Sequence, residues 1–97
     1  MGAPNEAWQL RIYRAKTGEL AEFVDEWRQH VLPLRKAKGF EVLGPWVTED
    51  DRFVWIVGHA DLAVADDEYY ASPDRAAIDP DPARHLAETE HVLMEER

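Results

Sequence analysis

The chain has 97 residues, the size of a single domain, and it lacks cysteine, which excludes disulfide bonds, thiolate metal ligands and thiol nucleophiles. Its formal net charge of −9 disfavours binding to nucleic acid or to anionic membranes. No apolar run approaches the roughly 20 residues of a membrane span, and the N-terminus has neither the basic nor the apolar region of a signal peptide, so we expect a cytoplasmic protein.

The first predicted element is a strand at Trp8–Arg14, which follows a flexible tail at residues 1–7 and opens a single domain at residues 8–97. Apolar and polar residues alternate along the strand, so Arg11 and Tyr13 point to one face and the apolar residues point to the other. The face of Arg11 and Tyr13 could be solvated, could contact a second copy of the chain, or could belong to a site.

A long helix is predicted from Gly18 to Lys38, and Gly39 suits the position after its end. Apolar residues recur along it at spacings of three and four and form one helical stripe. This stripe consists of Leu20, Phe23, Val24, Trp27, Val31 and Leu34. Pro33 cannot donate a hydrogen bond to the carbonyl of Gln29, so we expect a kink or a split in the helix there.

The stretch Phe40–His59 predicts a β-hairpin, because two runs of β-branched and aromatic residues enclose an acidic turn at residues 49–52. A turn of two or four residues would place Trp46 opposite Trp55. A turn of three residues would slip this register. Because turns of three residues usually contain a glycine and none is present here, we favour the first register.

Both faces of the predicted hairpin are apolar. In the favoured register one face carries Val42, Gly44, Trp46, Thr48, Phe53, Trp55, Val57 and His59, and the other carries Leu43, Pro45, Val47, Val54, Ile56 and Gly58. Pro45 has no N–H to donate to a ladder, so its strand should be an edge strand or should contain a bulge. An apolar sheet face that stays exposed indicates an interaction site.

The remaining chain predicts a helix that begins at Asp61, a fresh helical start at Ser72–Pro73 and a stop at residues 79–82. Residues 88–94 alternate like a last strand, with a helix as the alternative. The order βαββαβ is that of a ferredoxin-like α+β fold with a four-stranded antiparallel sheet. Two helices cover only one face of such a sheet, so we expect a homodimer that packs sheet to sheet.

Seven short segments occur in the order that is typical of one family. They are Leu10–Tyr13, Val31–Leu34, Gly39–Phe40, Leu43–Trp46, Phe53–Trp55, Tyr69–Pro73 and Asp79–Pro82. From Trp8 onward the chain resembles the NIPSNAP family, within the dimeric α/β-barrel superfamily. The resemblance implies a dimer of ferredoxin-like domains whose sheets form a barrel with the helices outside. It does not select an activity, because the superfamily includes cofactor-free oxygenases, isomerases, polyketide cyclases, haem enzymes and proteins with no known chemistry.

His59 is the best candidate for a catalytic acid or base, because imidazole transfers protons near neutral pH. It ends the second strand of the hairpin on the face of Trp55. If the first strand turns its polar face the same way, Arg11 could hold a carboxylate or an enolate and Tyr13 could add a second polar anchor. The alternative is that His59 only bonds a backbone carbonyl at the end of its strand.

Substrate contacts are predicted for aromatic side chains. Trp27, Trp46, Trp55 and Tyr69 could line a flat pocket, although the aromatic residues of a small domain also serve as its core. The four histidines are scattered along the chain. Because no pair of them has the close helical spacing of a zinc site, we expect no metal ligands and no cofactor.

Two functions compete at this stage. The first is a cofactor-free enzyme of the isomerase, cyclase or monooxygenase type, which acts on a small aromatic or polyketide-like metabolite in an aromatic-lined pocket. The second is a non-enzymatic interaction or scaffold protein whose acidic helices form the contact surface. The many aromatic residues favour a pocket, whereas the lack of a complete catalytic constellation favours the interaction protein.

Overall fold

The computed structural model describes residues 7–95 and residue 97. In chain order the elements are β1 (Ala7–Ala15), α1 (Leu20–Glu26), the π-helical turn η1 (Trp27–Val31), α2 (Leu32–Ala37), β2 (Glu41–Val47), β3 (Arg52–His59), α3 (Leu62–Ala71), α4 (Pro73–Ala76), the 3₁₀ turn η2 (Pro82–His85) and β4 (Leu86–Met94). The predicted tail lies outside the described residues, apart from Ala7, which belongs to β1 instead.

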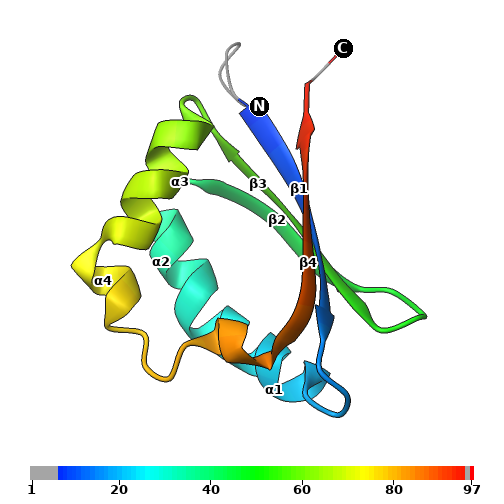
Figure 1. Cartoon of the computed structure of the whole chain (residues 1–97). Coiled ribbons are helices and arrows are strands. Elements are labelled where there is room, and N and C mark those ends of the chain that lie inside the picture. The colour runs from blue at the N-terminus through cyan, green and yellow to red at the C-terminus, as the bar shows by residue number, and fades with distance from the viewer. Residues whose placement is uncertain (1–6, 96) are drawn as a thin grey trace.

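The four strands form one antiparallel sheet in the order β2-β3-β1-β4, and the helices lie together on one of its faces (Figure 1). This topology confirms the predicted ferredoxin-like α+β fold, including the position of β2 at an edge. The sheet of a single chain is open, with β2 and β4 as its edges. None of the helices in the described residues combines the length and the apolar character that crossing a membrane requires.

The face of β1 that carries Arg11 and Tyr13 points toward the helices. Arg11 is 0% exposed and Tyr13 is 6% exposed, so the polar residues of this strand are its buried ones. Tyr13 packs with Phe53 and Phe23 in an aromatic core that also includes Trp27. Neither a solvated surface nor a contact with a second copy therefore describes this face.

The pairing of β2 with β3 differs from the favoured register. Trp46 lies opposite Val54 rather than opposite Trp55, so the predicted placement of Trp46 beside Trp55 is wrong. Along β3 itself the alternation is as predicted, since Phe53, Trp55 and Val57 are buried on the helical side while Val54 is only partly buried. The error lies in the turn and in the partner strand.

The turn that joins β2 and β3 contains three residues, 49–51. The backbone N–H of Thr48 donates to the carbonyl of Arg52 at 2.9 Å, and the N–H of Arg52 donates to the Thr48 hydroxyl at 3.0 Å. Asp51 has a φ of 63°, in the left-handed region that glycine usually occupies in such turns. Aspartate tolerates this conformation better than most residues, so the turn forms without a glycine.

A β-bulge at Gly44–Pro45 corrects the register further along β2. These two residues together lie opposite Trp55, and the pairing resumes with Leu43 opposite Ile56. Pro45 has no N–H for the ladder, and Gly44 adopts a φ of 99°. The prediction of an edge or bulged strand at Pro45 is confirmed on both counts. The bulge also places Leu43 and Trp46 on the same face of the sheet.

The first helix is interrupted at the predicted place. Before Pro33, the N–H of Leu32 bonds to the carbonyl of Trp27, five residues back, and η1 is a π-helical turn. Buried residues recur at Trp27, Val31 and Arg35 with a spacing of four. In an α-helix each such step overshoots a full turn by about 40°. The wider π turn cancels this rotation, so Arg35 stays on the same buried side of the helix as Trp27 and Val31.

The sheet face opposite the helices has no other element against it in the described part of the chain, and most of its side chains are apolar. We call it the open face. Its apolar side chains are Trp8, Leu10, Ile12, Leu43, Trp46, Val54, Ile56, Val92 and Met94, and none of them is buried. The charged side chains of Arg14, Arg52, Glu88 and Glu90 lie on the same face, toward the end of the sheet that holds the β2–β3 turn. A Cβ added to Gly58 would lie 2.6 Å from the Trp8 ring, so this glycine lets the indole lie flat on the sheet.

Candidate functional site

Two buried arginines from different elements meet at one carboxylate. Nη2 of Arg11, on β1, lies 3.0 Å from Oδ1 of Asp66, on α3, and Nη1 of Arg35, on α2, lies 2.7 Å from the same oxygen. Both arginines are 0% exposed, and the Asp66 side chain is 23% exposed. Charges this deep are stable only when they are paired, so Asp66 ties α2 and α3 to the sheet.

Tyr70 completes this group, and it lies one helical turn after Asp66 on the same side of α3. Its hydroxyl accepts hydrogen bonds from Nη1 of Arg11 at 3.0 Å and from Nη2 of Arg35 at 3.2 Å. Nε of Arg11 donates to Oε1 of Gln9 at 2.8 Å. We call Arg11, Arg35, Asp66 and Tyr70 the arginine cluster.

Aromatic rings surround the two guanidinium groups. The guanidinium carbon of Arg35 lies 3.8 Å from the centre of the Tyr69 ring and 4.7 Å from that of Phe40. The guanidinium carbon of Arg11 lies 5.2 Å from the centre of the Trp55 ring. Cation–π attraction compensates part of the hydration that a buried guanidinium loses. These contacts also hold both arginine side chains in fixed orientations.

The arginine cluster carries an excess of positive charge, because its two guanidinium groups share one carboxylate. Burial by itself lowers the pKa of Arg11, but the neighbouring Tyr13, Tyr70 and Asp66 outweigh burial and raise its pKa on balance. Arg11 is therefore charged at every accessible pH. The cluster attracts electron-rich groups that come close to it.

A cavity of about 200 Å³ lies between the sheet and the helices. Its walls include Tyr13, Trp27, Trp55, Tyr69 and Tyr70, so it shares Tyr70 with the arginine cluster. Nε1 of both tryptophans and the Tyr69 hydroxyl have no hydrogen-bond partner within the described residues. Most buried polar atoms have such a partner. Oxygen atoms of a ligand in this cavity would supply acceptors for them.

Arg75 brings a third guanidinium to the wall of the cavity. It follows Ser72, whose hydroxyl accepts the Arg75 backbone N–H at 3.2 Å and starts α4 as predicted for Ser72–Pro73. Nη2 of Arg75 lies 2.8 Å from Oδ1 of Asp81, while its Nε is buried without a partner in the described chain. Arg75 can therefore hold an acidic group of a ligand without giving up its ion pair.

Tyr13 and His91 are the two titratable groups of the cavity wall with complementary proton chemistry. Burial raises the pKa of Tyr13, although Arg11 opposes this, so the phenol keeps its proton at neutral pH. Partial desolvation, helped by the charge of Arg11, lowers the pKa of His91 below its ordinary 6.5 although the side chain stays exposed, so its imidazole is neutral and can accept a proton. The ring centres of Tyr13 and His91 are 6.2 Å apart, close enough for both to touch one small molecule.

The structure brings most of the predicted site residues together. Of the seven predicted residues, Arg11 belongs to the arginine cluster, and four others line the cavity: Tyr13, Trp27, Trp55 and Tyr69. Trp46 does not belong to this group, because it lies on the open face with 51% of its surface exposed. Its displacement follows from the three-residue turn, which moves Trp46 to the other side of β2.

His59 lies on the helical side of β3, but it lines a different hollow from Tyr13. This hollow of about 360 Å³ is bounded by Phe40, His59 and Tyr69 among others. The His59 ring lies 5.1 Å from the Phe40 ring, and its Nδ1 accepts the backbone N–H of Asp61 at 2.9 Å. His59 therefore bonds to the backbone at the end of its strand, as the alternative interpretation of the sequence predicts. Its partner is a backbone N–H, whereas that interpretation predicts a backbone carbonyl.

Sequence reasoning missed Arg35, Asp66 and His91 as site residues. Arg35 continues the buried four-residue spacing of Trp27 and Val31, which was the available signal. His91 shares the alternation of β4 with Leu93 and lies opposite Arg11 in the β1–β4 pairing. The only His and carboxylate group in the described chain with metal-ligand spacing is Glu22, Glu26 and His85, outside this cavity.

Comparisons with known proteins agree with this architecture. The NIPSNAP family profile matches residues 8–96, while no curated protein matches the chain. A NIPSNAP domain protein from Burkholderia xenovorans is 20% identical with a TM-score of 0.81, over 94% of each chain. A NIPSNAP family protein from Agrobacterium tumefaciens strain C58 is 18% identical with a TM-score of 0.81, over 95% of this chain and 93% of that one.

An antibiotic biosynthesis monooxygenase has the same fold at a lower similarity. It is 16% identical with a TM-score of 0.66, and the match covers 94% of this chain and 98% of that one. Structural likeness at such identities establishes the fold and leaves the chemistry open. The match of the family profile to nearly the whole chain is more specific, and by it the chain belongs to the NIPSNAP family.

Proposed function

We propose that this protein is a cofactor-free enzyme that binds a small aromatic or polyketide-like metabolite in the 200 Å³ cavity and moves a proton on it. The proposal rests on one observation: the aromatic cavity and the positively charged arginine cluster are adjacent, because Tyr70 belongs to both. A cavity of about 150 Å³ already holds benzene, so this one suits a single ring with small substituents.

The reaction that we propose is the enolisation of a ketone or a related carbonyl compound. The neutral imidazole of His91 takes a proton from the carbon next to the carbonyl, and the electron pair of the broken C–H bond forms the enolate. The phenol of Tyr13 donates a hydrogen bond to the enolate oxygen. Arg11 lies 3.5 Å from the Tyr13 hydroxyl and stabilises the developing negative charge through it. Return of the proton to another carbon gives isomerisation. Attack of the enolate carbon on a second carbonyl of the same molecule breaks the C=O π bond, and the resulting alkoxide takes the proton back from His91, which gives cyclisation.

Binding of an aromatic acid tests the cavity directly. We expect 2-hydroxybenzoate to quench the fluorescence of Trp27 and Trp55 and to bind about tenfold or more tightly than 2-hydroxybenzamide. The reason is that a charge-assisted hydrogen bond from Arg75 contributes about 1.5–3 kcal/mol. Arg75→Met should remove this preference, whereas Arg84→Met, which changes an exposed arginine outside the cavity, should keep it. Equal affinity for acid and amide in the unaltered protein would contradict the role of Arg75.

Proton exchange tests the chemistry separately. The protein should accelerate the exchange of the methylene protons of phenylpyruvate with D₂O, followed by NMR. His91→Gln should slow this exchange about 100-fold or more, because general-base catalysis contributes about 10²–10⁴. His59→Gln serves as the control with a second histidine, and it should have little effect. Binding of the compound without any exchange would instead favour a non-enzymatic binding protein.

The pH profile of this exchange should report the histidine. Only the neutral imidazole accepts a proton, so kcat/KM should fall on the acidic side as pH drops through the pKa of His91. Since partial desolvation and Arg11 lower that pKa, the acidic limb should lie below pH 6.5. An acidic limb well above pH 6.5 would exclude His91 as the base.

We also propose that two copies of the chain pack through their open faces. The support is the mostly apolar character of that face and the position of the helices of the described residues on the opposite side of the sheet. A largely apolar sheet face that no other element covers is unusual for a monomer. In such a dimer each cavity would stay on the outer side of its own sheet, so every copy would hold a complete site.

A further inference from the structure

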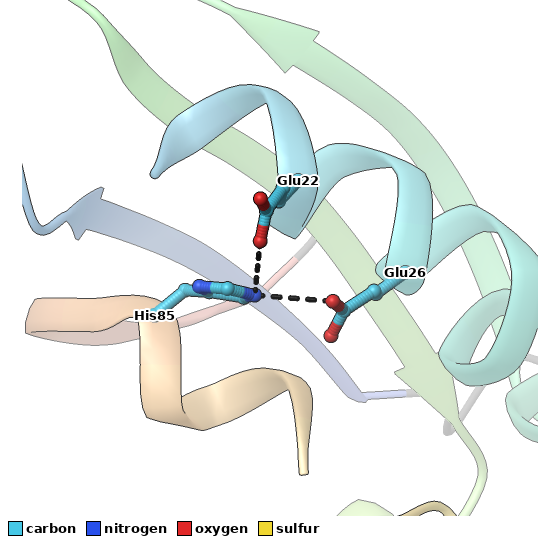
Figure 2. Close-up of side chains that lie close together, drawn as sticks. All are labelled: Glu22, Glu26 and His85. Atoms are coloured by element: carbon cyan, nitrogen blue, oxygen red, sulfur yellow. Dashed lines mark hydrogen bonds and ion pairs between the residues drawn. The ribbon is translucent and has the colours of Figure 1, made fainter. Parts of the chain in front are cut away.

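A histidine from another part of the chain projects toward glutamates on one side of the first helix, and Figure 2 shows two of these glutamates, Glu22 and Glu26, beside His85. Glu19 precedes α1, and Glu22 and Glu26 follow at spacings of three and four, which puts their carboxylates on one side. His85 belongs to η2, just before β4, and is 4% exposed. This group of four lies outside the aromatic cavity.

Both ring nitrogens of His85 face carboxylate oxygens. Nδ1 lies 2.8 Å from Oε1 of Glu19, while Nε2 lies 3.1 Å from Oε2 of Glu26 and 3.6 Å from Oε2 of Glu22. A neutral imidazole has only one N–H. When Nδ1 donates that proton to Glu19, Nε2 keeps a lone pair that points at groups that only accept. In this tautomer Nε2 needs a positive partner, which is either a second ring proton shared with Glu26 or a metal ion between Nε2 and the two carboxylates.

The distances around this space match the requirements of a metal ion. Zinc bonds of about 2.0–2.1 Å to nitrogen and oxygen at tetrahedral angles place the ligand atoms about 3.3 Å from one another. The Nε2–Oε2 distances of 3.1 Å and 3.6 Å bracket this value, and all three ligand atoms lie within 4.8 Å of one another. Glu19 on Nδ1 supplies the outer carboxylate that orients many zinc-bound histidines.

The charges of the group also call for a cation. Glu19, Glu22 and Glu26 bring three negative charges to one side of a short helix, where like charges four residues apart repel each other. Arg84 offsets one of them through two bonds to Glu26, Nη1–Oε1 at 2.7 Å and Nη2–Oε2 at 2.8 Å. A divalent ion would neutralise the remaining two, whereas a second proton on His85 would neutralise only one of them. Arg84 lies beside the site, and it competes with the ion for Glu26.

We propose that Glu22, Glu26 and His85 form a binding site for a divalent transition-metal ion of the zinc type, with a fourth position open to water. The ion would join α1 to η2. Both segments also supply walls of the aromatic cavity, Phe23 from α1 and Pro82 from η2. The bound ion therefore acts as a structural clamp that holds one end of the cavity closed, and it takes no part in the chemistry of His91.

Titration of the full-length, metal-free protein with Zn²⁺ tests this proposal, by calorimetry and by competition with a chromophoric chelator. We expect one equivalent to bind and to raise the melting temperature. Glu22→Gln changes a mostly exposed carboxylate, so it should fold normally. It should weaken binding by at least about 100-fold, since loss of an outer partner alone costs about 10–100-fold. His85→Gln should do the same, and Glu19→Gln should cost about 10–100-fold.

Two variants control for adventitious binding. His30→Gln changes an exposed histidine on η1, and it should leave the affinity for Zn²⁺ unchanged. Arg84→Gln removes the competing guanidinium, and it should tighten Zn²⁺ binding. The proposal is overturned if the protein binds no Zn²⁺ between pH 6 and 8, which would mean that a proton alone satisfies His85. It is equally overturned if Glu22→Gln binds Zn²⁺ as tightly as the unaltered protein.

Discussion

Replacement of Asp66 by asparagine should lower the free energy of unfolding by about 3–5 kcal/mol, the range typical of an uncompensated buried charge. Asp66 is the carboxylate that Arg11 and Arg35 share, and both arginines are fully buried. Without it, two guanidinium groups would face each other across Tyr70. Urea denaturation at one fixed protein concentration measures the loss, because assembly of the chain would also affect its stability.

Two further variants make this prediction specific. Asp67→Asn changes the exposed neighbour on the same helix and should alter stability by less than about 0.5 kcal/mol. Arg35→Met leaves Asp66 paired with Arg11, so no buried charge stays uncompensated, and it should cost less than Asp66→Asn. Equal losses for Asp66→Asn and Arg35→Met would show that the excess positive charge has no energetic consequence.

A lysine at Ile56 should abolish the proposed dimer. Ile56 lies on β3, in the interior of the sheet, and its side chain belongs to the open face. Burial of an unpaired ammonium group between two sheets costs about 3 kcal/mol or more, which raises the dissociation constant roughly a hundredfold or more. Sedimentation equilibrium at micromolar concentration should give about twice the chain mass of 11.2 kDa for the unaltered protein, and the chain mass for the variant.

Matched substitutions separate assembly from folding. Val64→Lys places the same charge on an exposed position of α3, on the helical side, and should leave the mass unchanged. Trp46→Lys changes a half-exposed side chain of the open face, so it should weaken assembly while the single chain still folds. A compact monomer for the unaltered protein at these concentrations would contradict the proposed sheet-to-sheet contact.

The order of the elements could be predicted from the sequence because each boundary has a local signal. Pro33 interrupts the first helix, Ser72 caps a new one, and Pro45 identifies an edge strand, all through groups that are close in sequence. These signals depend on missing N–H groups and on side chains that bond the nearby backbone. They are independent of the rest of the fold, which is why they could be interpreted correctly.

The register of the hairpin and the arginine cluster depend on contacts that local signals do not contain. Asp51 takes a left-handed conformation that usually requires glycine, which allows a three-residue turn. The register of the hairpin then places Trp46 on the open face instead of the helical face. Arg35 and Asp66 are 31 residues apart. Each of them alone resembles a solvated charge on a helix, and only the packing of α2 against α3 makes the two a buried pair.

The bulge at Gly44–Pro45 has a consequence for how copies of the chain can join. An incoming strand that tried to extend the sheet at β2 would meet an interrupted row of donors and acceptors. At the other edge, β4 presents Glu88 and Glu90, which would repel the same residues of a neighbouring copy if the edges paired. Growth of the sheet from chain to chain is therefore blocked at both ends. The association that we propose through the open faces would use the single open face of each copy, so it would end in a closed pair instead of a growing filament.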